Sequence, residues 1–207
     1  MTGPAYIQGA DMTQNSAQIV SFTRMDEGST EDYALLHKLE RDYVNALPDR
    51  ILAALRALDN SLSGYKVTRL EHSLQSATRA EHDGADDELV IAALIHDIGD
   101  DLAPENHSQM AASVIRPYVR AEVTWILEMH GLFQMYYYAD KVGLDKDERE
   151  RYRGHKWFDA AEQFCRDWDQ MSFDPDYETK PLSHFEDRLR QIFSRPAFDP
   201  AIIGETA

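Results

Sequence analysis

The chain has 207 residues, of which 43% are hydrophobic and 28% charged, and its one cysteine is Cys165. This composition is typical of a globular protein with a single core, and one cysteine excludes an internal disulfide framework and fits a reducing cytoplasm. The formal net charge of −16 at pH 7 argues against DNA or RNA as a partner, because nucleic-acid phosphates would be repelled over most of the surface.

Residues 1–30 are polar, with scattered glycine, proline, serine and threonine and little periodicity. We expect a flexible N-terminal arm over residues 1–30 and one domain over residues 31–207. The basic and apolar regions of a secretory signal are missing from this segment, so we predict a cytoplasmic protein.

From Asp32 onward, apolar residues recur at helical spacing, whereas the alternation typical of strands is nearly absent. The predicted fold class is therefore all-α. The predicted helices cover about 32–43, 51–58, 67–82, 89–95, 106–117, 119–130, 158–168 and 185–193.

The segment Leu89–Ile95 is apolar on every side, which is typical of a central, buried helix, but it is too short to span a membrane. It ends in His96 and Asp97. A histidine and a carboxylate at the end of a buried helix are costly unless something compensates them, and a metal ion accepts both as ligands. For an isolated pair, a core histidine bonded to a backbone carbonyl is the commoner explanation.

The pair is not isolated. His72 stands in a helix where an apolar residue would be expected, and His107 follows the pair across a short polar loop. His130 closes a further apolar run, and Asp169 stands at the end of another amphipathic helix. Four histidines and two aspartates at helix ends or inward faces provide enough ligands for two metal ions with open positions.

The order of these residues resembles that of a known superfamily. His72, the His96–Asp97 pair and Asp169 follow one another as in the HD superfamily, a helical fold best known for metal-dependent phosphohydrolases. His107 and His130 match the binuclear branch of that superfamily. The resemblance implies an HD-domain helical bundle with a binuclear metal site in its core.

Longer strings are similar to the HD-domain diiron oxygenases, which include the phosphonate-cleaving oxygenases and, more distantly, myo-inositol oxygenase. The similarity covers roughly residues 64–193. The strings that carry it are Leu70–Gln75, Gly84–Asp86, Ala92–Gly99 and Arg166–Asp169.

This resemblance implies a role for each ligand. A first ion would be held by His72, His96, Asp97 and Asp169, and a second by the bridging Asp97 with His107 and His130. The implied cofactor is a pair of iron ions in a mixed-valent Fe(II)/Fe(III) state, with manganese or zinc as alternatives. The implied partners are dioxygen and a small hydroxylated substrate, such as a phosphonate or a polyol, whose C–C or C–P bond is cleaved oxidatively.

The sequence departs from the phosphonate oxygenases near the expected substrate. Gln134 stands where they have a lysine, and Arg153–His155 replaces a Gln-Gly-Gly segment. Leu62 stands where a tyrosine closes over their metals, although Tyr65 is near enough to act instead, and Arg166 remains. The catalytic candidates are Asp97, Tyr65 and Arg166, and the substrate-binding candidates are Tyr65, Gln134, His155 and Arg166.

Two other functions stay open at this point. A phosphohydrolase acting on a nucleotide or another phosphoester would use the same metal pair to activate water, with Asp100 or Asp101 as a candidate base. A non-catalytic regulatory domain would need the metal ligands alone. The run Tyr136–Tyr138 has at most two rings that can face one pocket, where they would recognise a polyol or a quaternary ammonium group. Core and surface aromatics are the commoner explanation of such a run. The sequence leaves the oligomeric state open.

Overall fold

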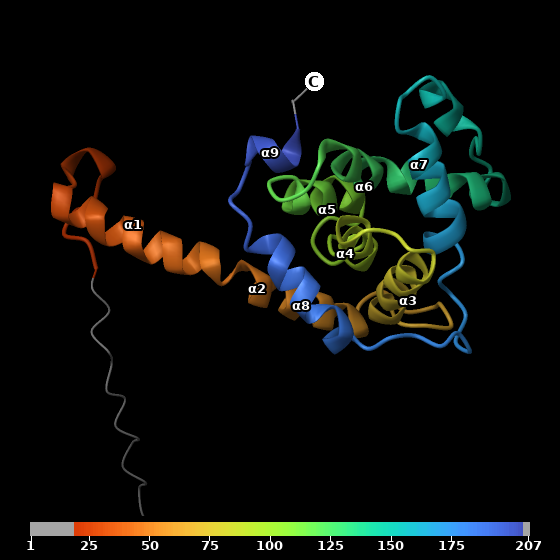
Figure 1. Cartoon of the computed structure of the whole chain (residues 1–207), viewed down its shortest axis with the longest axis horizontal. Coiled ribbons are helices and arrows are strands. Elements are labelled where there is room, and N and C mark those ends of the chain that lie inside the picture. Colours follow the sequence, from red (N-terminus) through yellow and green to blue (C-terminus); the bar gives the residue numbers. More distant parts are fainter. Residues whose placement is uncertain (1–18, 205–207) are drawn as a thin grey trace, which may run out of the picture. The chain divides into compact units, whose positions relative to one another are not determined.

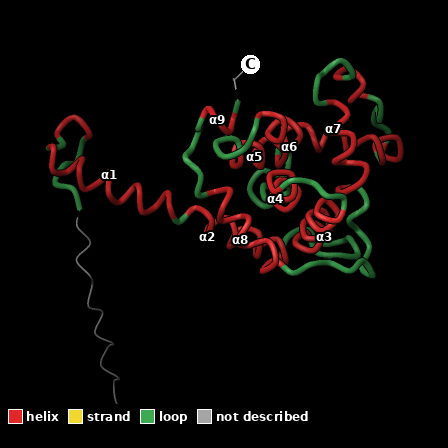
Figure 2. Tube along the Cα trace, viewed as in Figure 1, coloured by secondary structure: helices red, strands yellow, loops and turns green. Residues whose placement is uncertain are grey.

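The structure, a computed structural model, describes residues 19–204 (Figure 1). Between these residues it contains helices and loops but no β-strand (Figure 2), so the predicted all-α fold class is confirmed. The α-helices of this part are α1 (Thr30–Asn45), α2 (Leu47–Ala57), α3 (Arg69–His82), α4 (Asp87–Ile95), α5 (His107–Ile115), α6 (Ala121–Gln134), α7 (Phe158–Gln163), α8 (Leu182–Phe193) and α9 (Pro200–Ile203).

The chain divides into two units, and the boundary differs from the predicted one. The N-terminal unit is Met1–Ala46 and the main unit is Leu47–Ala207. We expected the boundary after residue 30, whereas α1 belongs to the N-terminal unit. Residues 1–18 of the expected arm lie outside the described residues.

Asp32 organises the described part of the N-terminal unit. Its carboxylate accepts hydrogen bonds from the backbone N–H groups of Ser21 and Ser29, at 2.7 and 3.0 Å, and from both serine hydroxyls. The Ser29 hydroxyl in turn caps α1 by accepting from the Asp32 N–H, which completes a capping box. These bonds, that from the Ser21 N–H first, lower the pKa of Asp32 to about 2.

The main unit is built around α4, which lies among α3, α6 and α8 (Figure 1). Its start is set by Asp86, whose side chain accepts from the Leu89 N–H at 3.1 Å. All residues from Val90 to Ile95 are buried, as the uniformly apolar pattern predicts. The end of α4 therefore lies inside the core, and so do the residues that follow it directly, His96 and Asp97.

Glu81 connects α3 to α8 and to the loop before α8. Its carboxylate lies 2.8 Å from Lys180 Nζ and 3.0 Å from His184 Nε2, and it accepts a hydrogen bond from Arg188. Burial alone would raise the pKa of Glu81, but these three neighbours outweigh it and lower the pKa to about 2. The loop that leads from Asp169 back to α8 is thus tied to α3.

A π-helical segment, Phe164–Asp169, continues α7 without a break. Its widened turn is visible in the bond from the Gln170 N–H to the Cys165 carbonyl, at 3.0 Å, which spans five residues. The buried Cys165 thiol donates to the His130 carbonyl at 3.4 Å and so connects this segment to α6. Within residues 19–204, no helix combines the length and apolar character that crossing a membrane requires.

Candidate metal centre

The six predicted ligands converge beside the end of α4. Five of them are almost completely buried, and the His107 side chain is 27% exposed. They come from α3 (His72), the C-cap of α4 (His96), the following turn (Asp97), the first residue of α5 (His107), α6 (His130) and the end of the π-helical segment (Asp169).

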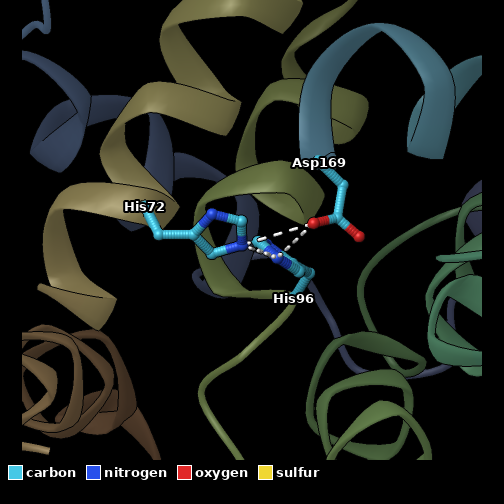
Figure 3. Close-up of side chains that lie close together, drawn as sticks. All are labelled: His72, His96 and Asp169. Carbon is cyan, nitrogen blue, oxygen red and sulfur yellow. Dashed lines mark hydrogen bonds and ion pairs between the residues drawn. The ribbon is translucent and has the colours of Figure 1, made fainter. Parts of the chain in front are cut away.

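His72, His96 and Asp169 form a first group (Figure 3). The two Nε2 atoms are 3.0 Å apart, and Asp169 Oδ1 lies 3.3 Å from His72 Nε2 and 3.7 Å from His96 Nε2. Asp97 Oδ2 joins them at 3.2 and 3.1 Å from the same two nitrogens. Two donor atoms held about 2.1 Å from one ion at right angles are about 3.0 Å apart, so these spacings suit ligands of a single ion.

A second group faces the other oxygen of Asp97. Asp97 Oδ1 lies 3.6 Å from His107 Nε2 and 3.6 Å from His130 Nε2. The carboxylate of Asp97 therefore stands between the two groups, with one oxygen toward each. A carboxylate in this position would suit the role of a bridging ligand between two ions.

Each imidazole is held by a backbone carbonyl at its Nδ1 atom. A carbonyl oxygen can only accept, so Nδ1 carries the proton, and Nε2 of a neutral ring presents a lone pair to the site. The accepting carbonyls belong to Ser172 for His72 (2.9 Å), Ala93 for His96 (2.7 Å), Pro104 for His107 (3.3 Å) and Leu127 for His130 (2.7 Å). All four rings are thereby oriented as metal ligands usually are.

Two observations indicate that a cation fits among these atoms. His130 Nε2 is buried and has no hydrogen-bond partner, which is costly for a polar atom unless it binds a metal. The Nε2 atoms of His72 and His96 face each other at 3.0 Å, where two lone pairs would repel without a positive charge between them. The donor set of neutral imidazoles and carboxylates suits iron, manganese or zinc.

The electrostatics of the first group favour positive charge. Burial alone lowers the pKa of His96, but the carboxylates of Asp97 and Asp169 outweigh it and raise the pKa well above its usual value. Conversely, burial alone raises the pKa of Asp169, yet its bonds to His72 and His96 lower it. The buried carboxylates thus stabilise positive charge among the imidazoles, as they would stabilise a bound cation.

Two glycines permit the close packing that brings the second group together. A Cβ atom on Gly99 would lie 2.9 Å from the backbone of His107, so a side chain there would push α5 away from Asp97. A Cβ atom on Gly131 would lie 2.6 Å from the hydroxyl of Ser108. Gly99 therefore sets the distance between the turn after α4 and α5, and Gly131 the distance between α6 and α5.

Arg69 is a site residue that the sequence reading did not select. It lies one turn before His72 on α3, and its guanidinium donates to Asp97 and, at 2.6 Å, to Asp100 Oδ2. Its side chain is 11% exposed. The spacing of three residues from His72 on a helix was the available signal, because such residues share a face.

The predicted ligands other than His96 line a cleft with a volume of about 1020 Å³. Tyr65 lines this cleft, with its ring stacked on Phe173, whose ring in turn stacks on His72. Gln134 also lines it and donates from Nε2 to Asp169 Oδ1 at 3.0 Å. The structure therefore brings two of the predicted substrate-binding candidates, Tyr65 and Gln134, to the metal ligands.

The structure does not bring Arg166 or His155 to the cleft. Arg166 lies on the outer side of the π-helical segment, where it pairs with Asp167 at 2.8 Å and is 52% exposed. The His155 ring stacks on Trp125 with centroids 3.9 Å apart, outside the cleft lining. An ion pair with the adjacent residue holds the Arg166 side chain, and an aromatic stack the His155 side chain, outside the cleft lining.

Two of the three consecutive tyrosines face the cleft. Tyr137 and Tyr138 line it, whereas the ring of Tyr136 lies against the protein's own cations, 3.6 Å from Arg149 Cζ and 4.6 Å from Lys146 Nζ. The expected limit of two rings in one pocket agrees with this arrangement.

Comparison with known proteins gives two matches. The family model of the HD domain matches residues 69–173, about half of the chain. A protein of Leisingera caerulea, named as a dioxygenase that acts on (1-hydroxy-2-(trimethylamino)ethyl)phosphonate and forms glycine betaine, is 32% identical over 94 residues. The match covers 40% of this chain and 48% of that protein, so the chain spans about half the length of this relative.

Proposed function

The chain belongs to the HD domain family, and on this premise we propose that it is a binuclear metalloenzyme, a diiron oxygenase that oxidatively cleaves a small hydroxylated substrate. The observation that carries the proposal is the position of Asp97. Its two oxygens face two separate sets of imidazoles, His72 with His96 and His107 with His130. A single-metal site would need only one of these sets.

The proposed roles of the residues follow from their contacts. The four histidines, oriented through Nδ1, and the carboxylates of Asp97 and Asp169 hold the pair of ions. Two irons, when bound, supply the electrons and open positions that a reaction with dioxygen requires. Arg69 fixes the orientation of Asp97 through its hydrogen bond. Tyr65, half exposed at the cleft wall, is the side chain that we assign to substrate contact.

The oxygenase reading is supported by the relative from Leisingera caerulea, which is named as a dioxygenase. The reacting part of a small hydroxylated compound fits a cleft of about 1020 Å³ that ends at the metal ligands. A substrate that binds here would meet both groups of ligands at once, because His72, Asp97, His107, His130 and Asp169 all line the cleft.

Metal analysis of protein purified without oxygen tests the proposal. We expect about two irons per chain and, after partial oxidation, a low-temperature EPR signal from a coupled Fe(II)/Fe(III) pair. Oxygen uptake with hydroxylated substrates should then depend on that signal. If iron reconstitution never produces the coupled signal, the oxygenase proposal fails.

A phosphohydrolase is the second candidate, and the position of Asp100 favours it. Asp100 forms a group with Asp97 and His107 in which one donor atom of each residue lies within 4.8 Å of the others, so a further carboxylate stands beside the second group and would be the base for water in this proposal. Manganese or zinc in the purified protein, together with hydrolysis of phosphoesters that Asp100→Asn reduces at least about tenfold, would favour this function over the first.

A further inference from the structure

Gln134 makes one hydrogen bond and leaves one polar atom unused. Its Nε2 donates to Asp169 Oδ1 at 3.0 Å, which fixes the orientation of the amide, because the reverse orientation would set two oxygens against each other. The other atom of the amide, Oε1, is buried and has no hydrogen-bond partner. A buried acceptor without a partner is uncommon in a folded protein and indicates a group that something else satisfies.

Gln134 also lines the cleft, in contact with Asp169 of the first group. Because both amide atoms belong to one planar group, Oε1 lies within roughly 5 Å of Asp169 Oδ1, the ligand oxygen nearest to His72. A substrate hydroxyl bound at the first group thus brings its neighbouring substituent within reach of Oε1. An amide oxygen accepts hydrogen bonds and repels anionic oxygens.

The charged residues of the cleft do not offer a free cation beside Gln134. Among the described residues that line it, the two cations are Arg69 and Arg151, and both are already paired. Arg69 contacts Asp97 and Asp100, and Arg151 lies 2.9 Å from Glu148. An anionic group on the substrate would find no unpaired basic side chain at this position.

We propose that Gln134 determines substrate class: its Oε1 accepts a hydrogen bond from an uncharged donor next to the metal-bound hydroxyl, as in a vicinal diol, and disfavours a phosphonate or carboxylate there. This inference rests on the proposed binding of a hydroxylated substrate at the metal centre. Through Nε2, Gln134 also orients Asp169, so its two roles must be separated by experiment.

Measuring substrate binding without turnover separates the role of Gln134 Oε1 in substrate recognition from the role of Nε2 in orienting Asp169. Iron-loaded protein is titrated calorimetrically under argon with erythritol and with (1-hydroxyethyl)phosphonate, after metal content has been measured for every variant. Gln134→Met removes the acceptor and should weaken erythritol binding about tenfold while leaving phosphonate binding unchanged or tighter. Gln134→Lys should shift the ratio of the two affinities toward the phosphonate by at least about tenfold.

Gln109→Lys is the matched control, because Gln109 lines the same cleft from α5 and the substitution adds the same charge. We expect this variant to leave the affinity ratio close to that of the unmodified protein. An unchanged erythritol affinity in Gln134→Met, an equal shift in the Gln109 control, or no binding of either probe to the unmodified protein overturns the assignment. Dioxygen is absent, so failure of the oxygenase proposal would appear separately, in oxygen uptake.

Discussion

Asp97 makes contacts that few buried carboxylates make at once. One oxygen faces His72 and His96, the other faces His107 and His130, and Arg69 donates to the first. Burial alone raises the pKa of Asp97, but His96 and the other imidazoles outweigh it and lower the pKa well below its usual value.

His130→Ala should remove one of the two ions. His130 supplies one of the two imidazoles of the second group, whereas the first group keeps all its ligands. We expect the metal content to fall from about two ions per chain to about one, measured by elemental analysis. His155→Ala is the control, because the His155 ring stacks on Trp125 outside the cleft, and it should keep both ions. Equal loss in both variants would contradict the assignment of His130.

At this scale, the six ligands predicted from the sequence lie together in the structure, whereas only two of the predicted substrate-binding residues, Tyr65 and Gln134, line the cleft. His96 and Asp97 could be recognised because polar groups at the end of a buried, apolar helix need compensation. Arg166 could not be placed, because the choice between the cleft and an ion pair with Asp167 depends on which way the segment turns. No pattern in the amino-acid sequence indicates in which direction this segment turns.

At the scale of elements, the π-helical segment Phe164–Asp169 explains that failure. Its apolar spacing predicts an ordinary helix, in which Arg166 and Asp169, three residues apart, would share a face. Successive residues of a π-helix are separated by a smaller angle about the helix axis than those of an α-helix. As a result, Asp169 points to the predicted metal ligands while Arg166 points outward. The helices themselves were predicted because their periodicity is local, whereas the widened turn depends on tertiary contacts such as that of Cys165 with His130.

The junction of α3 and α8 gives a prediction for pH. The folded-state pKa of Glu81, about 2, lies below the ordinary value of 4.5, so the folded chain binds fewer protons than the unfolded chain between these values. The stabilisation is complete above about pH 5 and is lost as the pH falls toward 2. Glu81→Gln should lower the free energy of unfolding by about 1–2 kcal/mol at pH 7, the full shift being discounted for the partly exposed cations.

Urea unfolding of both proteins from pH 7 to pH 3 measures this effect. The difference between Glu81→Gln and the unmodified chain should shrink as the pH falls, because protonation removes the charge that the substitution removes. Comparing the two proteins at each pH cancels the loss of metal in acid. A difference that stays constant with pH would show that the hydrogen bonds of Glu81, and not its charge, stabilise the junction.

At the scale of the whole molecule, the apolar core belongs to the main unit. The buried apolar residues of the described part all lie between Pro48 and Phe193. A chain that begins at Leu47 should therefore fold and keep about two metal ions, with a cooperative thermal transition. Circular dichroism and elemental analysis check this. A chain that begins at residue 31, the boundary predicted from the sequence, serves for comparison, and loss of metal only in the shorter chain would show that α1 contributes to the site.

The origin of the ligands in separate elements has a consequence for how the protein is made. The first ligand, His72, and the last, Asp169, stand far apart along the chain, and His72 is oriented by the carbonyl of Ser172, which follows Asp169 in the sequence. Such non-local contacts form late in folding. No partly synthesised chain ending before Asp169 presents the complete set. Full metal occupancy therefore marks a polypeptide that has been synthesised at least as far as Ser172 and has folded, and metal content can serve as a quality measure for each preparation.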